Sequence, residues 1–132
     1  MGRGQINNTN REQSHKIHRA MKTREYLNDV CNTIAQQMGG KKFFETTKTT
    51  PAFCFFTTKN QHPAIVFNLH KDCKFSILTV IYIDGWDTYK MVFTDRSGNN
   101  RKEYTEVYCD QLQDIFTEAT GISTEQCRVV FA

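Results

Sequence analysis

The feature that most constrains the fold is a change of hydrophobic period near residue 40. Before it, apolar side chains from Ile17 to Met38 recur at steps of three and four, which places them on one stripe of a helix. After it, Thr, Phe, Val, Ile and Tyr dominate short runs separated by turn residues, as in β-strands. The pattern predicts a helix over about 22–38, ended by Gly39-Gly40, and a capping box at 9–12 would allow it to begin as early as Asn10.

The β-rich part predicts six strands, over 43–48, 53–58, 64–69, 74–83, 86–94 and 102–108. The clearest connection is Asp84-Gly85, a dipeptide that favours a two-residue hairpin turn and would pair Ile83 with Trp86. Both faces of this hairpin then carry large apolar side chains, so a single layer of helices would cover only one of them. We expect the other face to need a partner, which could be the rest of the domain, a homodimer mate or a target protein.

A second helix is predicted over about 109–120, and Cys127 to Phe131 is a candidate for a short final strand. The apolar residues of this helix share one face: Leu112, Ile115, Phe116 and Ala119. The order predicts an α+β fold with an N-terminal helix, an antiparallel β-meander of five or six strands and a C-terminal helix packed on one sheet face. We expect residues 1–20 to form a basic N-terminal extension, flexible or partly helical, and residues 21–132 to form a single domain.

Positive charge is concentrated at the start of the chain. The net charge is +3, but residues 1–24 hold six basic and one acidic side chain (6 minus 1, or +5), which leaves −2 for the rest. The basic residues are Arg3, Arg11, Lys16, Arg19, Lys22 and Arg24. Such a segment is typical of proteins that bind phosphate backbones, and a solubilising tail is an equal alternative. Since no base-reading motif accompanies it, nucleic-acid binding there would be sequence-independent.

The loop 95–104 and Trp86 are further candidate binding elements. The loop carries three basic residues, Arg96, Arg101 and Lys102. Two acidic residues reduce its net charge to +1 (3 minus 2), so we interpret it as a solvated turn that could add cations to an interface formed elsewhere. Trp86 stands beside the hairpin turn, where burial in the core is the commoner fate of an aromatic side chain, and an interface anchor or a stacking platform is the alternative.

No motif in the sequence specifies a reaction, a cofactor or a metal. A P-loop, a dinucleotide fingerprint and a nucleophile elbow are all missing, and the five cysteines include no CxxC pair. These cysteines, Cys31, Cys54, Cys73, Cys109 and Cys127, fit small core residues in a reducing compartment. No apolar run is long enough for a membrane span. We therefore expect a cytoplasmic protein that needs no cofactor, metal or membrane.

These features together favour a binding role over an enzymatic one. We expect a non-enzymatic protein that docks on a larger protein or nucleoprotein complex, with a sheet or helix face for apolar contact and the basic segment for charge. Its size and layout are compatible with inhibitors of host machinery encoded by viruses or mobile elements. The alternative is a sequence-independent nucleic-acid-binding protein that uses residues 1–24. An enzyme that uses His15, His18 or a cysteine is a third hypothesis.

Overall fold

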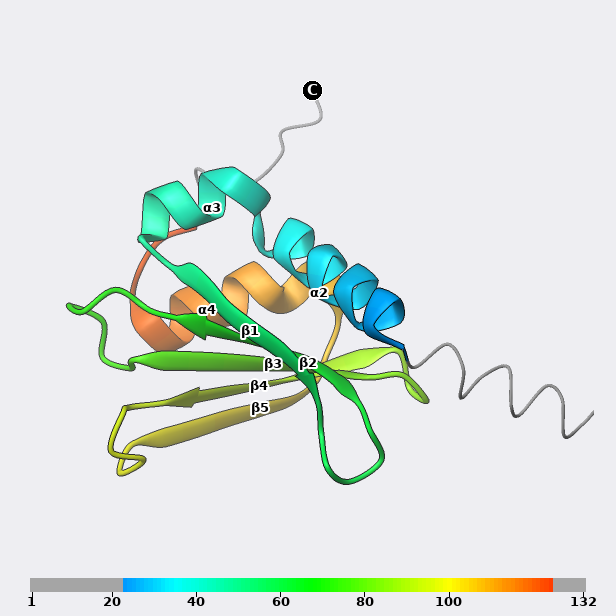
Figure 1. Cartoon of the computed structure of the whole chain (residues 1–132). Helices are drawn as coiled ribbons and strands as arrows, with labels where there is room; N and C mark the ends of the chain where they lie inside the picture. The colour runs from blue at the N-terminus through cyan, green and yellow to red at the C-terminus, as the bar shows by residue number, and fades with distance from the viewer. Residues whose placement is uncertain (1–22, 125–132) are drawn as a thin grey trace, which may run out of the picture.

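The computed structural model of the protein describes residues 23–124 and contains helices packed on an antiparallel sheet (Figure 1). The elements are α2 (Arg24–Met38), α3 (Gly40–Thr47), β1 (Thr50–Phe56), β2 (Pro63–Asn68), β3 (Ile77–Ile83), β4 (Thr88–Thr94), β5 (Arg101–Val107), a 3-10 turn η1 (Cys109–Gln111) and α4 (Leu112–Thr120). The five strands lie in chain order, so the sheet is a meander. The predicted α+β class is confirmed, whereas the predictions for 1–22 and for the final strand lie outside the described residues.

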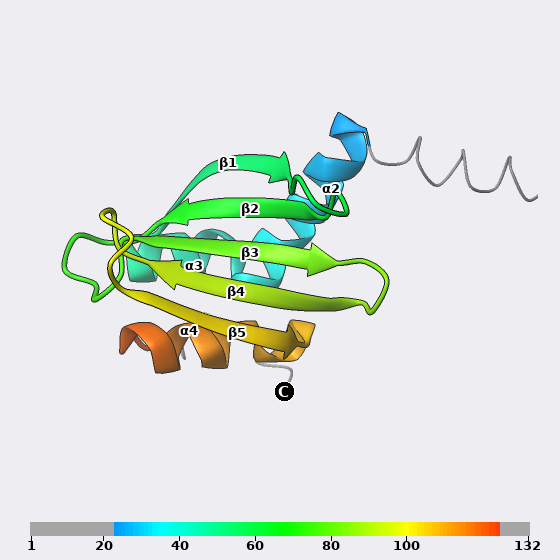
Figure 2. The same ribbon diagram turned by 90° about the horizontal axis from the view of Figure 1, so that it is seen from below.

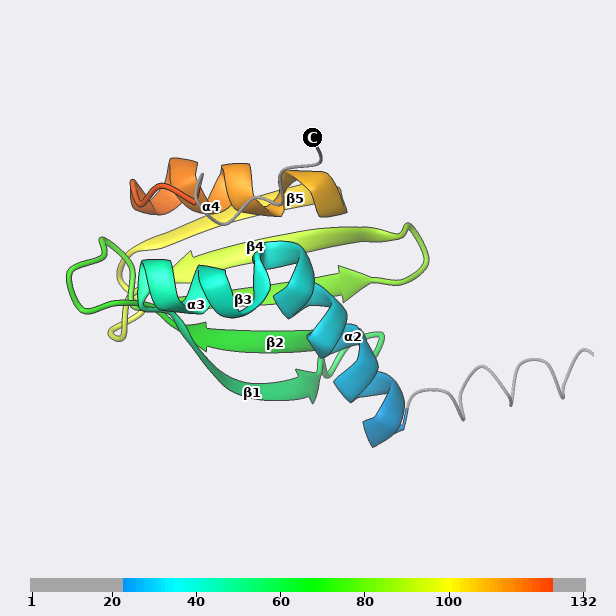
Figure 3. The same ribbon diagram turned by 90° about the horizontal axis from the view of Figure 1, so that it is seen from above.

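The described helices α2, α3 and α4 all cover the same face of the sheet. Figure 2 shows the opposite face, which no helix of residues 23–124 covers, and Figure 3 shows the helices in front of the strands. The core forms between the two layers, where Phe116 of α4 lies edge-on to Phe43 of α3 at 4.9 Å between ring centroids. We call the uncovered side the open face.

Helix α2 follows the predicted apolar stripe. Its buried residues, Leu27, Cys31, Ile34 and Met38, lie three or four positions apart, as one face of a helix requires. Thr23 caps the start, because its hydroxyl oxygen accepts a hydrogen bond from the Tyr26 amide at 3.3 Å. Gly39 ends the helix with φ of 126°, and its amide donates to the carbonyls of Ala35 and Gln36. The predicted end at Met38 is confirmed.

The strand predicted over 43–48 is wrong, because residues 43–47 belong to α3 and Lys48 caps its end. Gly39 and Gly40 do not end the helical region but redirect it, with φ values of 126° and 62° that glycine adopts without strain. Phe43 and Thr47, one turn apart, are both buried, and the Thr47 hydroxyl donates to the Phe43 carbonyl at 2.7 Å. Burial of this face overrides the β-propensity of the Phe and Thr side chains.

The two-residue turn at Asp84-Gly85 is also wrong, since the turn between β3 and β4 spans 84–87. Ile83 lies opposite Thr88 rather than Trp86, which shifts the predicted register by two residues. The Trp86 amide donates to the Ile83 carbonyl at 3.1 Å, and Asp87 adopts a left-handed φ of 54°. A shift of two leaves every side chain on its predicted face, because side chains alternate with a period of two.

The other predicted elements are confirmed with shifted ends. The five remaining strands differ from the predicted bounds by at most three residues, and the second helix begins as the 3-10 turn η1 before α4. No helix among residues 23–124 is both long enough and apolar enough to cross a membrane.

Candidate binding sites at one end of the sheet

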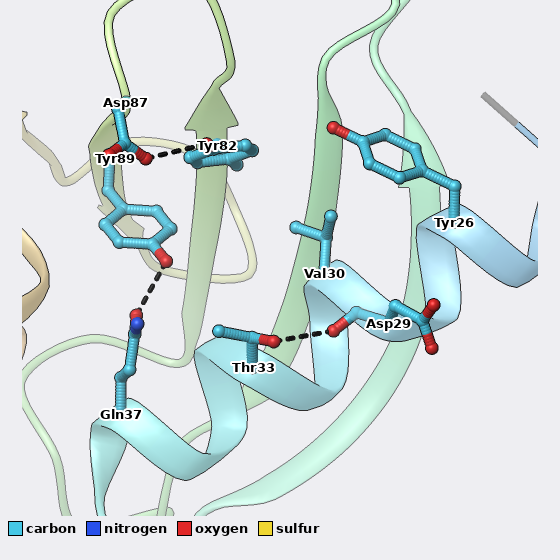
Figure 4. Close-up of a pocket in the computed structure, with 8 residues that line it drawn as sticks. All are labelled: Tyr26, Asp29, Val30, Thr33, Gln37, Tyr82, Asp87 and Tyr89. Atoms are coloured by element: carbon cyan, nitrogen blue, oxygen red, sulfur yellow. Dashed lines mark hydrogen bonds between the residues drawn. The ribbon is translucent and has the colours of Figure 1, made fainter. Parts of the chain in front are cut away.

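Two hollows flank the β3–β4 hairpin near its turn, one on each face of the sheet. The first, which we call the tyrosine cleft, lies on the helix side, between α2 and the hairpin (Figure 4). The second, which we call the aromatic groove, lies on the open face, beside Trp86 of the turn and Tyr108 at the end of β5. Helix α2 starts at this same end of the sheet (Figures 1 and 3). Three chain segments far apart in sequence therefore meet here.

The tyrosine cleft has a volume of about 300 Å³ and a polar, aromatic lining. Its lining residues are Tyr26, Asp29, Val30, Thr33 and Gln37 of α2 together with Tyr82, Asp87 and Tyr89 of the hairpin. Helix α2 presents its residues at steps of three and four, on a stripe beside the one buried in the core. The hairpin can supply both tyrosines because Tyr82 lies directly opposite Tyr89, with 5.5 Å between the ring centroids.

Two hydrogen bonds fix the hairpin side of the cleft. The Tyr82 hydroxyl donates to Asp87 Oδ1 at 2.7 Å, which ties the β3–β4 turn to its own strand. The Tyr89 hydroxyl donates to Gln37 Oε1 at 2.6 Å, which ties the sheet to α2 (Figure 4). Nearby, His62 Nδ1 lies 3.4 Å from Asp84 Oδ1, which joins the start of β2 to the same turn. These contacts hold the end of the hairpin in one position.

All three tyrosines of the cleft keep their protons at neutral pH. Burial, followed by the nearby Cys109 and Asp87, raises the pKa of Tyr89 to about 12, although the hydrogen bond to Gln37 opposes this shift. Burial and the hydrogen bond to Asp87 raise the pKa of Tyr82 far above its ordinary value. Burial, followed by the charge of Asp84, raises the pKa of Tyr26. The cleft thus offers neutral phenols and two aspartates with no basic lining residue, a surface unsuited to phosphate.

The aromatic groove has a volume of about 430 Å³ and two exposed aromatic side chains at its rim. Trp86 is 81% exposed and Tyr108 is 57% exposed. Ile83 and the buried Thr88 form part of the lining, together with Lys90, Thr105 and Glu106. The ammonium of Lys90 lies 3.1 Å from Glu103 Oε1, so the positive charge is already paired. The groove therefore presents apolar and aromatic surface with little net charge.

Apolar side chains of the open face continue from the hairpin to β1, but Val66 and Val92 among them are buried. One row of the sheet runs from Phe53 through Val66, Thr79 and Val92 to Glu103, each opposite the next. Phe53 is 59% exposed at the β1 end of this row. Charged side chains of the row occur only at the β5 end. The expectation that one face of the hairpin stays uncovered by helices therefore agrees with the described structure.

The structure separates the sequence-predicted binding residues into distinct places. Trp86 is exposed in the turn rather than on a strand, and Arg24 is exposed at the first position of α2, at the same end of the sheet. The predicted residues Arg96, Arg101 and Lys102 lie at the opposite end of β4 and β5. The five remaining predicted residues, Arg3, Arg11, Lys16, Arg19 and Lys22, are outside the described residues.

The 95–104 loop is organised by its own side chains. Asp95 Oδ1 accepts hydrogen bonds from the Ser97 hydroxyl and the Asn99 amide, both at 2.9 Å, and Oδ2 accepts from the Asn100 amide at 3.2 Å. Desolvation raises the pKa of Asp95, but these hydrogen bonds outweigh it and hold the pKa below its usual value. The interpretation as a solvated turn agrees with this self-contained bonding.

Two of the three basic residues of the loop region have partners within β5. Arg101 Nε forms an ion pair with Glu103. Lys102 Nζ lies 5.4 Å from the ring centroid of Tyr104, within the range of a cation–π contact. Arg96 is exposed in the loop itself. Arg101 shares the Glu103 carboxylate with Lys90, so Glu103 offsets only one of these two cations, and Lys102 keeps its charge in the cation–π contact.

The cysteines differ in their surroundings. Cys31 is buried, its thiol donates to the Ala64 carbonyl at 3.5 Å, and burial raises its pKa well above the ordinary value. Cys54 and Cys73 are half-buried, whereas Cys109 is exposed, so the expectation of core cysteines is wrong for Cys109. Among residues 23–124, no group of three or more His, Cys, Asp or Glu could hold a metal ion.

The tyrosine cleft was not predicted from the sequence. The polar positions of α2 that line it do recur at helical spacing, but their counterparts on the hairpin depend on the correct register. The predicted two-residue turn places Tyr89 opposite Val80, whereas the four-residue turn places it opposite Tyr82. Comparisons with known protein families, with functionally described proteins and with solved structures find no match for this chain.

Proposed function

We propose that this protein is a non-enzymatic binding protein that docks on a larger protein or nucleoprotein complex through the aromatic groove. The observation that carries this proposal is Trp86, which is 81% exposed at the rim of a groove on the open face. Tryptophan and tyrosine are enriched among the residues that dominate binding energy at protein interfaces. Because an exposed aromatic side chain has a large apolar surface in water, its coverage by a partner contributes more binding free energy than coverage of a smaller side chain.

The chemistry of the groove favours a protein surface over a phosphate backbone as the ligand. Its basic residue, Lys90, is paired with Glu103, and Glu106 adds a carboxylate to the lining. Phosphate recognition needs several unpaired cations, which the lining of this groove does not provide. An apolar side chain of a partner, held between Trp86 and Tyr108, fits the lining better.

The basic segment supports a role for charge in the same complex. Residues 1–24 carry a net charge of +5 (6 minus 1), and this segment leads into α2 at the end of the sheet where Trp86 lies. A partner that occupies the groove therefore lies at the same end of the sheet as Arg24, the last residue of the basic segment. The same charge is the observation that favours the second candidate, a sequence-independent nucleic-acid-binding protein led by residues 1–24. A role as an inhibitor of host machinery stays a prediction.

Capture of partners from the native cell, with and without nuclease, tests the proposal. The bait proteins are the wild type, Trp86→Ala, and Phe53→Ala as a control that removes an exposed aromatic from the far edge of the same face. We expect partner proteins that resist nuclease and moderate salt, are retained by Phe53→Ala and are lost with Trp86→Ala. Capture that disappears with nuclease and falls steeply with salt would instead support the nucleic-acid candidate.

A further inference from the structure

The two edge strands of the sheet differ sharply in chemistry. Strand β5, with the sequence RKEYTEV, carries four charged residues: Arg101, Lys102, Glu103 and Glu106. Strand β1, with the sequence TPAFCFF, carries none. Charged side chains on an edge strand prevent it from pairing with strands of other molecules, whereas an uncharged apolar edge invites such pairing. Of the two edges, only β1 therefore has the composition of a pairing surface.

The main-chain groups that point outward from β1 follow from its pairing with β2. The Thr57 amide donates to the His62 carbonyl at 2.8 Å, so this pair is a hydrogen-bonded one. Hydrogen-bonded and non-hydrogen-bonded pairs alternate in an antiparallel ladder. Phe53 and Phe55 therefore direct their amides and carbonyls toward β2, and Cys54 and Phe56 direct theirs away from the sheet. Phe56 lies opposite Pro63, which has no amide to donate, in agreement with this alternation.

Exposed apolar side chains lie along the same edge. Phe53, which is 59% exposed, and the half-buried Phe55 project from the open face with 5.9 Å between their ring centroids. No described strand pairs with the outer side of β1, although the start of α2 lies near its C-terminal end (Figures 2 and 3). The edge thus combines available main-chain groups with apolar surface beside them.

We propose that β1 pairs with β1 of a second copy of the chain, in antiparallel orientation about a two-fold axis at Phe55. In this register Cys54 of each copy exchanges main-chain hydrogen bonds with Phe56 of the other copy. Phe55 then faces Phe55 of the other copy in a non-hydrogen-bonded pair, where side chains approach most closely. The two sheets become one continuous sheet with both open faces on the same side.

A second copy suits this edge for two reasons. Antiparallel pairing of a strand with itself is satisfied by the two-fold symmetry that most homodimers have, so one patch serves both copies. Because β1 has no charged residue, its self-pairing brings no like charges together. Pro51 and the register shift between Pro51 and Phe53 confine the regular seam to the stretch from Phe53 to Thr57, in which Phe53 lies opposite Thr57 of the other copy.

Disulfide trapping with two matched variants tests this register. Phe55→Cys places two cysteines opposite each other across the seam, whereas Phe53→Cys places its cysteines on either side of the axis, out of bonding range. Phe53 is the more exposed residue, so random collisions would favour cross-linking of Phe53→Cys. We expect mild oxidation to convert most of Phe55→Cys to a dimer linked through position 55, and to leave Phe53→Cys at the level of the wild type.

Equal cross-linking of the two variants, or none with Phe55→Cys, would overturn the proposal. Light scattering provides a second measurement that needs no introduced cysteine. The wild type should show twice the chain mass, and Phe55→Lys, which opposes two positive charges at the axis, should show the chain mass with an unchanged circular dichroism spectrum. A wild type that stays at the chain mass at high concentration would also overturn it. Neither test involves Trp86 or a partner protein, so failure here leaves the proposed docking function standing.

Discussion

Replacement of Trp86 by alanine should weaken partner binding without weakening the fold. The side chain is 81% exposed, so it contributes little to the core, and we expect the free energy of unfolding to change by about 0.5 kcal/mol or less. Its accessible area is roughly 250 Å² when fully exposed, of which about 200 Å² is left for a partner to cover. At about 25 cal/mol per Å², complete coverage is worth about 5 kcal/mol.

Partial coverage gives the working magnitude for this variant. If a partner covers half of the exposed indole, the Trp86→Ala variant should bind it about 2.5 kcal/mol more weakly than the wild type. This difference is a decrease in affinity of roughly 70-fold. The assay pairs urea unfolding of the isolated proteins with calorimetric titration of the captured partner. Phe53→Ala, on the same face but outside the groove, should keep affinity within about threefold of the wild type.

Two results would refute this reasoning. If Trp86→Ala lost more than about 1 kcal/mol of folding stability, the side chain would belong to the packed structure rather than to an interface. If its affinity equalled that of the wild type, the exposed indole would not be a binding anchor.

The remaining predictions concern the fold and the cleft. Phe116→Ala should lower the free energy of unfolding by about 3–5 kcal/mol in urea, because Phe116 is fully buried against Phe43. Tyr89→Phe removes the hydrogen bond to Gln37 and should cost about 1 kcal/mol by the same measurement. Since the folded pKa of Tyr89 is raised from 10.0 to about 12, the contribution of its protonated hydroxyl to the free energy of unfolding should be complete below pH 10. This contribution should disappear as the pH rises through 12, and ultraviolet titration follows the ionisation of the tyrosine. Asp95→Ala should speed amide exchange in the 95–104 loop, and in the wild type the same loosening should appear as the pH falls through the lowered pKa of Asp95.

The sequence carried enough information for the fold class, because local patterns determine it. The apolar stripe in α2 and the β-rich runs each determine an element and its buried face. An error of two residues in the strand register does not change these faces, because side chains alternate with a period of two. The α3 segment could not be predicted from local sequence patterns. Phe43 and Thr47 favour a strand by propensity, but Phe43 is buried against Phe116 across more than 70 positions of sequence, a contact that no local pattern reveals.

The candidate sites were harder to predict because they depend on turn geometry and on long-range neighbours. Asp84-Gly85 favours a two-residue turn, but the hydrogen bond from Tyr82 to Asp87 stabilises a longer one, in which Asp87 adopts a left-handed backbone. That change moves Trp86 from a strand into the exposed turn and brings Tyr82 opposite Tyr89. Trp86 could be singled out as a candidate anchor from the sequence, whereas the tyrosine cleft required both the observed register and the packing of α2.

Photo-cross-linking inside the native cell tests the central claim, docking through the aromatic groove, most directly. A photoreactive phenylalanine analogue is placed at position 86, and a control protein carries it at position 99, in the exposed loop at the opposite end of β4. We predict a discrete protein adduct from position 86 that resists nuclease and is absent from position 99. No adduct at position 86, equal adducts at both positions, or an adduct removed by nuclease would contradict docking through the groove.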